Sequence, residues 1–242
     1  MSSAVRDGVA TLWLDRPGRG NALSAVAVDA LLAALLEANA DPGVHTVIFR
    51  GRGKHFCTGF DLSDLESETD ATLRNRFVAL EKLLQAVWYA PVRTVAFATG
   101  RTWGAGADLF ASCDIRACAP DATFRFPGSA FGIVLGTRRL VELIGWDRAR
   151  PLTTEGAAVD AAGALAISLA TDIVTGDAEA WLAARGSRPV ANRATFATIR
   201  AACRPDHRAG DMASLDASAS RPGLRERIAD YREALRNRRA EP

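Results

Sequence analysis

Two glycine-centred stretches, FCTGFDL at residues 56–62 and GRTWGAGADL at residues 100–109, decide how this chain is expected to fold. Each follows a short apolar run, 46–50 or 92–98, whose length favours a buried strand, and each leads into sequence compatible with a helix. A tight loop between a strand and a helix leaves backbone N–H groups unpaired, and these can point at a ligand. Two such loops brought together form a clamp for one oxygen atom. The sequence therefore predicts an oxyanion-binding site with the carboxyl group of Asp108 beside it.

The composition is that of a soluble globular protein with a large α/β core. At 242 residues, 48% apolar and 24% charged, the chain is long enough to bury such a core. We expect the sheet-rich core over residues 1–190 and a helical region over residues 191–242. The formal net charge is +2, and the arginines are spread out, with no basic block interleaved with aromatic residues. Nucleic acid is therefore not an expected partner.

The cysteines and the first residues favour a cytoplasmic protein. Cys57, Cys113, Cys118 and Cys203 show no C-x-x-C spacing and have no histidine pair nearby, so neither a metal site nor a disulfide framework is predicted. The first residues lack the charged-then-apolar run of a signal peptide. We expect no membrane insertion, because no apolar run approaches the length of about 18 residues that a spanning helix needs.

The rest of the sequence predicts alternating strands and helices, followed by a helical end. Ser24 is placed to cap a helix over residues 26–38. Residues 127–136 are too rich in glycine for regular structure and are expected to form a loop that lines the site. The expected strands are 8–15, 44–50, 92–98, 114–119, 122–126 and a short one within 167–174; the other expected helices are 73–87, 107–112, 137–144, 146–152, 161–167, 178–185, 193–203 and 223–238.

Together with the glycine turns, the element RPGRGNALS at residues 16–24 resembles the enoyl-CoA hydratase/isomerase (crotonase) superfamily. The resemblance runs from about residue 8 to about residue 174, in the order and spacing that this family uses. It implies the ClpP/crotonase-like fold, an α/β fold of repeated ββα units, with a C-terminal helical region that forms a homotrimer or a dimer of trimers. It also implies an acyl-CoA thioester substrate, with coenzyme A as part of the substrate and no other cofactor and no metal.

The resemblance assigns roles to the two turns. The family stabilises a thioester enolate with two backbone N–H groups, which here belong to Phe60 and Ala105. A fixed donor at the start of a helix stabilises such an oxyanion without reorganisation, provided that Ala105 has a negative φ. Asp108 stands where the family commonly has a glutamate that acts as general acid or base.

The second glutamate of the hydratases falls at Gly128, and the loop that follows is about three residues shorter than usual in the family. No aspartate within 131–137 replaces it. Asp108 is therefore the single expected acid or base. The remaining expected substrate contacts come from the 16–24 loop, from the two turns and from the pocket wall, where core packing is an equal alternative for Trp103 and Phe131: Arg19, Gly20, Ala22, Gly59, Asp61, Leu62, Trp103, Gly104, Gly128 and Phe131.

Hydratase or isomerase chemistry on an enoyl-CoA is the leading functional hypothesis. A decarboxylating or C–C bond-cleaving relative is the first alternative, because decarboxylation generates the enolate without a base. A catalytically silent acyl-CoA-binding protein is the second, favoured by Gly128 and the short loop. A nucleophilic Cys57 is a further hypothesis, although a buried structural thiol is the better interpretation because no histidine is placed to activate it.

Overall fold

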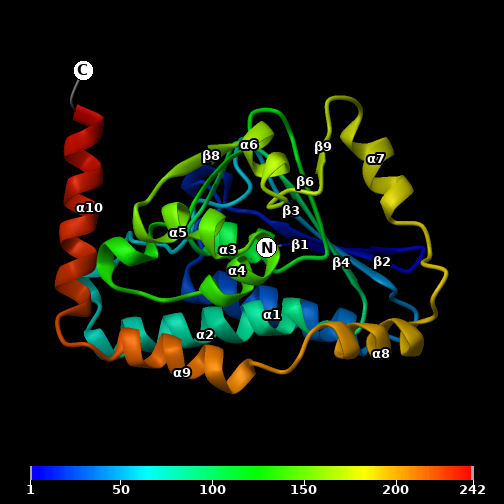
Figure 1. Ribbon diagram of the computed structural model, residues 1–242, viewed down its shortest axis with the longest axis horizontal. Coiled ribbons are helices and arrows are strands. Elements are labelled where there is room, and N and C mark those ends of the chain that lie inside the picture. Colours follow the sequence, from blue (N-terminus) through cyan, green and yellow to red (C-terminus); the bar gives the residue numbers. More distant parts are fainter. Residues whose placement is uncertain (1, 241–242) are drawn as a thin grey trace.

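The computed structural model describes residues 2–240 and has an α/β architecture (Figure 1). The predicted region 191–242 is thus described as far as residue 240. A larger sheet has the order β1-β2-β3-β4-β6-β9, and a smaller one has the order β5-β7-β8. In the larger sheet only β1 is antiparallel to its neighbour. The strands are β1 Ser2–Arg6, β2 Val9–Leu14, β3 Thr46–Gly51, β4 Arg93–Ala98, β5 Arg101–Trp103, β6 Ile115–Cys118, β7 Thr123–Arg125, β8 Ala158–Asp160 and β9 Asp172–Ile173.

The middle of each central strand, residues 47–49 of β3 and 95–98 of β4, is continuously apolar because both faces of the larger sheet are covered. In β3, Val47 and Phe49 belong to the main core, whereas Ile48 between them belongs to a second cluster. That second cluster includes Phe97 of β4 and Leu182 of α7 (Ala178–Arg185). The continuous apolar runs at 44–50 and 92–98 therefore encode strands of a two-sided parallel sheet, as predicted.

Helices cover the faces of the sheet and form most of the second half of the chain (Figure 1). Ser24 caps α1 as predicted, accepting a hydrogen bond from Ala27 N at 3.3 Å. Helix α9 and strands β1, β5 and β8 were not predicted. The three strands are short, with 5, 3 and 3 residues, and α9 has few large apolar residues. The remaining bounds are α1 Ala25–Ala40, α2 Asp70–Trp88, α3 Ala105–Ala111, α4 Thr137–Ile144, α5 Trp146–Thr154, α6 Ala161–Ala166, α8 Arg193–Cys203, α9 Arg208–Ala219 and α10 Leu224–Ala240.

The C-terminal helices contact the core at specific polar positions. Arg200 of α8 donates to the backbone oxygens of Trp88 and Val92 and pairs with Asp114. Asp70, at the start of α2, accepts from the backbone N–H groups of Gly223 and Arg225. Helix α9 packs along α2, and α10 stands at one end of the molecule beside the start of α2 (Figure 1). The boundary at 190/191 stays a prediction.

The 127–136 segment contains a short 3-10 helix, Pro127–Phe131, where the sequence predicted no regular structure. Pro127 begins this turn, since its fixed φ suits a helical first position. Gly132 ends the turn with a φ of 76°. Over residues 2–240, none of the helices is long and apolar enough to cross a membrane.

Candidate functional site

The two glycine turns lie directly against each other. Cys57 N donates to Arg101 O at 3.2 Å, and Trp103 N donates to Cys57 O at 2.9 Å. Gly59 has a φ of 97°, and a Cβ at this position would lie 2.8 Å from Trp103 O and 3.5 Å from Ala105 N. Glycine is therefore required at residue 59 both for the backbone conformation and for the close approach of the second turn.

This approach places two unpaired N–H groups side by side. Within the described part of the chain, neither Phe60 N nor Ala105 N has a hydrogen-bond acceptor. Ala105 is the first residue of α3 and follows Gly104, which has a φ of 53° and a ψ of −130°. Ala105 itself is not among the residues with positive φ. Alanine at this position therefore costs no backbone strain.

Asp108 lies in the first turn of α3, three residues after Ala105, and is only 7% exposed. Its carboxyl group has no hydrogen-bond partner among the residues that the structure describes. Burial raises the pKa of Asp108 well above its ordinary value. Of the nearby charges, the Arg139 guanidinium lowers this pKa and the Glu81 carboxylate raises it, with Arg139 the stronger. Asp108 is thus a carboxyl group that holds its proton more tightly than an exposed one.

A cavity of about 980 Å³ opens beside the two turns and Asp108. Its wall combines apolar side chains with the polar 16–24 loop, which is the mixture expected of a small-molecule site. Every site residue predicted from the sequence lines it, which brings together segments far apart in the chain: Arg19, Gly20, Ala22, Gly59, Phe60, Asp61, Leu62, Trp103, Gly104, Ala105, Asp108, Gly128 and Phe131. Their individual roles stay predictions.

Asn21 fixes the 16–24 loop to the end of β3. Its Oδ1 accepts from Arg16 N at 2.8 Å, and its Nδ2 donates to Arg52 O at 2.9 Å and to His55 O at 2.7 Å. Asn21 has a φ of 56°, a left-handed conformation that asparagine tolerates better than most residues. The loop is therefore held in place by one buried amide.

Asp61 fixes the other side of the loop. Its carboxylate accepts from Arg16 at 2.7 Å and from the Ser63 hydroxyl at 2.7 Å. Burial raises the pKa of Asp61, but the bonds from Ser63 and Arg16 outweigh it and the net shift is downward. The backbone is engaged as well, since Asp61 N donates to Leu23 O at 3.1 Å and Asp61 O accepts from Arg76 at 2.9 Å. Asp61 therefore holds the loop in place, and its predicted contact with substrate stays a prediction.

An aromatic row forms one wall of the cavity, and sequence reasoning missed two of its four members, Phe77 and Tyr231. Phe60 stacks on Phe77 of α2 with ring centroids 4.5 Å apart. Phe131 lies 6.3 Å from Phe77 and 5.2 Å from Tyr231 of α10. The helical pattern of 73–87 indicated only that Phe77 is buried, and nothing in the sequence placed Tyr231 near residue 60.

Trp103 also lines the cavity, with its indole N–H donating to the Thr123 hydroxyl at 3.2 Å. His55 is a lining residue that was not predicted; its Nδ1 accepts from Arg101 N at 3.1 Å. Cys57 is fully buried, and burial raises the pKa of its thiol to about 12. The interpretation of Cys57 as a structural thiol is confirmed, since such a group is not ionised at neutral pH.

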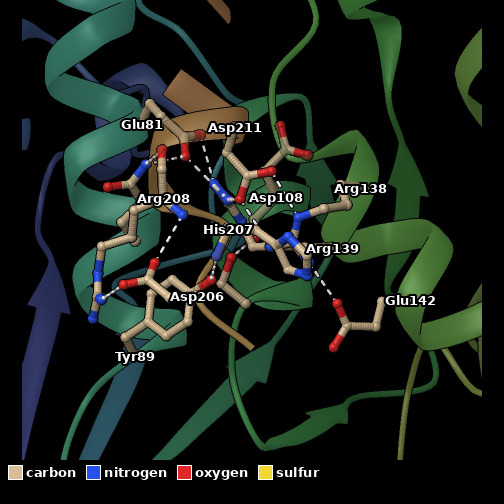
Figure 2. A network of polar contacts seen from close by, with 12 residues as sticks. Glu81, Tyr89, Asp108, Arg138, Arg139, Glu142, Asp206, His207, Arg208 and Asp211 are labelled. Carbon is tan, nitrogen blue, oxygen red and sulfur yellow. Dashed lines mark hydrogen bonds and ion pairs between the residues drawn. The ribbon is translucent and has the colours of Figure 1, made fainter. Parts of the chain in front are cut away.

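A buried group of charges lies behind Asp108 (Figure 2). Arg139 of α4 makes a bidentate pair with Glu81 of α2 at 3.0 and 2.5 Å, and both side chains are 1% exposed. Arg139 also donates to Asp211 of α9 at 2.8 Å, and Asp211 in turn accepts from Arg138. No sequence pattern signals this cluster, because its members come from three helices. Among the described residues no group of His, Cys, Asp and Glu has the arrangement of a metal site.

Comparison with known proteins shows which family this chain is similar to. The sequence profile of the enoyl-CoA hydratase/isomerase family matches residues 4–187. The protein named "Probable enoyl-CoA hydratase echA6" of Mycobacterium bovis is 36% identical over 181 residues, which are 73% of this chain and 72% of that protein. A peroxisomal Delta(3,5)-Delta(2,4)-dienoyl-CoA isomerase of Arabidopsis thaliana is 32% identical over 156 residues, 58% of this chain and 56% of that one.

The structural likeness is as extensive. The solved structure of a candidate enoyl-CoA hydratase/isomerase from Bordetella parapertussis superimposes with a TM-score of 0.92 at 39% identity, covering 95% of this chain and 97% of the other. The fold is therefore the crotonase-type α/β fold that the sequence predicted. This chain belongs to the enoyl-CoA hydratase/isomerase family, and the prediction of an enzyme of that family is confirmed.

Proposed function

We propose that this enzyme binds an acyl-CoA thioester with its carbonyl oxygen between Phe60 N and Ala105 N, and that it moves a proton on the acyl chain with Asp108. The observation that carries the proposal is the pair of unpaired N–H groups converging beside a buried carboxyl group. When a proton leaves the carbon next to the carbonyl, negative charge develops on the thioester oxygen. Preorganised donors in a site of low polarity stabilise that charge more than water does.

The carboxyl groups of the cavity favour isomerisation over hydration. In the described cavity wall the carboxylates are Asp108 and Asp61, and Asp61 is held by Arg16 and Ser63. Gly128 occupies the position where a second carboxylate is expected for adding water. A single carboxylate is sufficient for isomerisation: it removes a proton from the α-carbon of a 3-enoyl thioester and returns it to the γ-carbon, so that the double bond moves to the 2-position.

The distribution of polar and apolar side chains in the cavity determines the orientation in which the substrate binds. The polar 16–24 loop with Arg19, and Arg101 on β5, suit the phosphates of coenzyme A, because a guanidinium matches a phosphate in shape and charge. The row of Phe77, Phe131 and Tyr231 then faces the acyl chain. This orientation brings the reacting carbons beside Asp108.

The test follows the absorbance of the conjugated 2-enoyl thioester. With 3-hexenoyl-CoA, isomerisation increases this absorbance; with crotonyl-CoA, hydration decreases it. We expect an increase with the first substrate that Asp108→Asn reduces by about 100-fold or more, which is the range typical of general acid–base catalysis. Asp64→Asn, on an exposed neighbouring loop, is the matched control and should leave the rate unchanged.

Equal rates in wild type and Asp108→Asn would show that Asp108 has no catalytic role. Acyl-CoA binding without turnover of enoyl, malonyl and β-hydroxyacyl thioesters would favour the silent binder. Release of carbon dioxide from a malonyl thioester would instead favour a decarboxylating enzyme, in which a protonated Asp108 supplies a proton to the enolate.

A further inference from the structure

The charged cluster behind Asp108 contains an unsatisfied donor. The Nη atoms of Arg139 are occupied by Glu81 and Asp211 at distances of 2.5 to 3.0 Å. Its Nε, however, is buried and has no hydrogen-bond partner within the described residues. A buried N–H without an acceptor is costly, so an unpaired one calls for a physical explanation.

The unsatisfied acceptor lies on the neighbouring helix. The Asp108 carboxyl group also lacks a hydrogen-bond partner in the part of the chain that the structure describes. It packs against Gly136, three residues before Arg139 at the start of α4, so closely that a Cβ on residue 136 would overlap its Oδ1. Figure 2 shows Asp108 within the same group of side chains as Arg139 and Glu81. An unpaired buried donor and a carboxyl group that lines the cavity without a protein hydrogen-bond partner are thus brought together by α3 and α4.

We propose that Arg139 is the positioning residue for Asp108: held in place by Glu81 and Asp211, it stabilises the ionised form of Asp108 through its free Nε–H, directly or through one water molecule. This role of Arg139 rests on the proposed function in one respect: it assumes that Asp108 transfers a proton during the reaction. A carboxyl group that removes and returns protons needs its two forms close in free energy. Burial alone favours the neutral form, and a nearby guanidinium restores the balance.

The charges that act on Asp108 come from two helices. Arg139 on α4 favours the carboxylate, and Glu81 on α2 opposes it. Asp211 on α9 pairs with Arg139 at 2.8 Å and with Arg138 at 2.7 Å. The pKa of Asp108 therefore depends on how far the negative charge of Glu81 offsets the positive charge of Arg139.

Two variants change this balance in opposite directions. Glu81→Gln keeps the shape of the side chain but removes the opposing charge, so the carboxylate form of Asp108 should become more favourable. The double variant Glu81→Leu with Arg139→Met removes both charges and should make it less favourable, since Arg139 is the stronger influence. The double variant is used because Arg139→Met alone leaves Glu81 buried and unpaired, which is strongly destabilising. Glu142→Gln is the control, because Glu142 is exposed and pairs with Arg138 instead.

The measurement is an NMR titration of protein with isotope-labelled aspartate carboxyl groups, in which Asp108 is assigned by the signal lost in Asp108→Asn. Relative to wild type, we expect the midpoint to fall by about 1 pH unit or more in Glu81→Gln. It should rise in the double variant and stay unchanged in Glu142→Gln. Unchanged midpoints in both folded test variants would overturn the proposal.

Kinetics provides a second, separable readout. If the enzyme turns over a thioester, the acidic limb of the kcat/KM profile should move with the NMR midpoint while KM stays constant. A purely structural role would instead lower activity at every pH without moving the limb. If no thioester is turned over, the proposed function fails, while the titration still decides the role of Arg139.

Discussion

The carboxyl group of Asp108 is buried, which disfavours its ionised form. Single glycine residues shape its surroundings. Gly136 leaves room for its Oδ1, and Gly59 and Gly104 adopt positive φ values so that two N–H groups can meet beside it. None of these features stabilises the fold in an obvious way. Residues that break local rules without a structural gain are typical of functional sites.

Replacing Asp108 should stabilise the protein. Since burial raises the pKa of Asp108, the folded state keeps its proton at pH values where the unfolded chain has released it. The contribution of the neutral Asp108 to stability is fully present below the pKa of this group in the unfolded chain. It is lost as the pH rises through the higher pKa of the folded state. The asparagine in Asp108→Asn does not ionise, so the stability of this variant does not fall with pH in this way. The free energy of unfolding of Asp108→Asn should therefore exceed that of wild type by an amount that grows with pH, to about 0.5–2 kcal/mol at neutral pH. Urea unfolding at several pH values measures it; a variant less stable than wild type throughout would contradict the burial argument.

Two glycines with positive φ flank α4, and only one of them contacts Asp108. Gly136 has a φ of 68° and contacts Asp108, whereas Gly145 has a φ of 77° and a methyl group added there would have nothing within 4 Å. Alanine should cost about 1–2 kcal/mol of stability at Gly136, whose backbone is left-handed with a ψ of −8°, and at least as much at Gly145, whose ψ of 159° is adopted almost only by glycine. Only Gly136→Ala displaces the Asp108 carboxyl group. Only this variant should therefore show a lower kcat per folded molecule. Steady-state kinetics with thermal melts separates the two effects, and equal kcat values in both variants would contradict it.

At the scale of elements, the strand–turn–helix units were predictable because each has a local signal. The apolar runs at 44–50 and 92–98, the cap at Ser24 and the glycine turns all act within a few residues. The family resemblance then placed the site residues along one cavity. By contrast, the place of Tyr231 beside Phe131 and the Arg139–Glu81 pair were not predicted, because these contacts join segments far apart in the sequence. Side-chain pairing across helices has no period or spacing in a single sequence.

The donors of the proposed oxyanion hole are backbone groups, so they are tested through the geometry of the turns. Gly59→Ala introduces a methyl group against Trp103 O and should push the two turns apart. We expect kcat/KM to fall by about 100-fold or more, the typical cost of one oxyanion donor. Gly156→Ala, at a φ of 68° with open space around it, is the control for backbone strain alone. A Gly59→Ala enzyme that is no slower than Gly156→Ala would contradict the role of this turn.

At the scale of the whole molecule, the large cavity is bounded at one end by α10 and lies beside exposed apolar residues. Trp146, at its rim, is 53% exposed, and Val134 is 41% exposed. Apolar side chains gathered at a rim are common where another chain packs. The family resemblance implies a homotrimer or a dimer of trimers, for which we predict a mass by size-exclusion chromatography and light scattering of three or six times 25.7 kDa. A stable monomer would contradict this expectation.

The proposed function depends on where the thioester of a bound acyl-CoA lies in the cavity. Its most direct test is a crystal structure of the protein with a non-reactive acyl-CoA thioester analogue bound. We predict that the thioester oxygen lies about 2.7–3.1 Å from both Phe60 N and Ala105 N. The α-carbon of the acyl chain should then face Asp108, and the chain should run along the aromatic row. A thioester oxygen beyond hydrogen-bond distance of either N–H group would contradict the account.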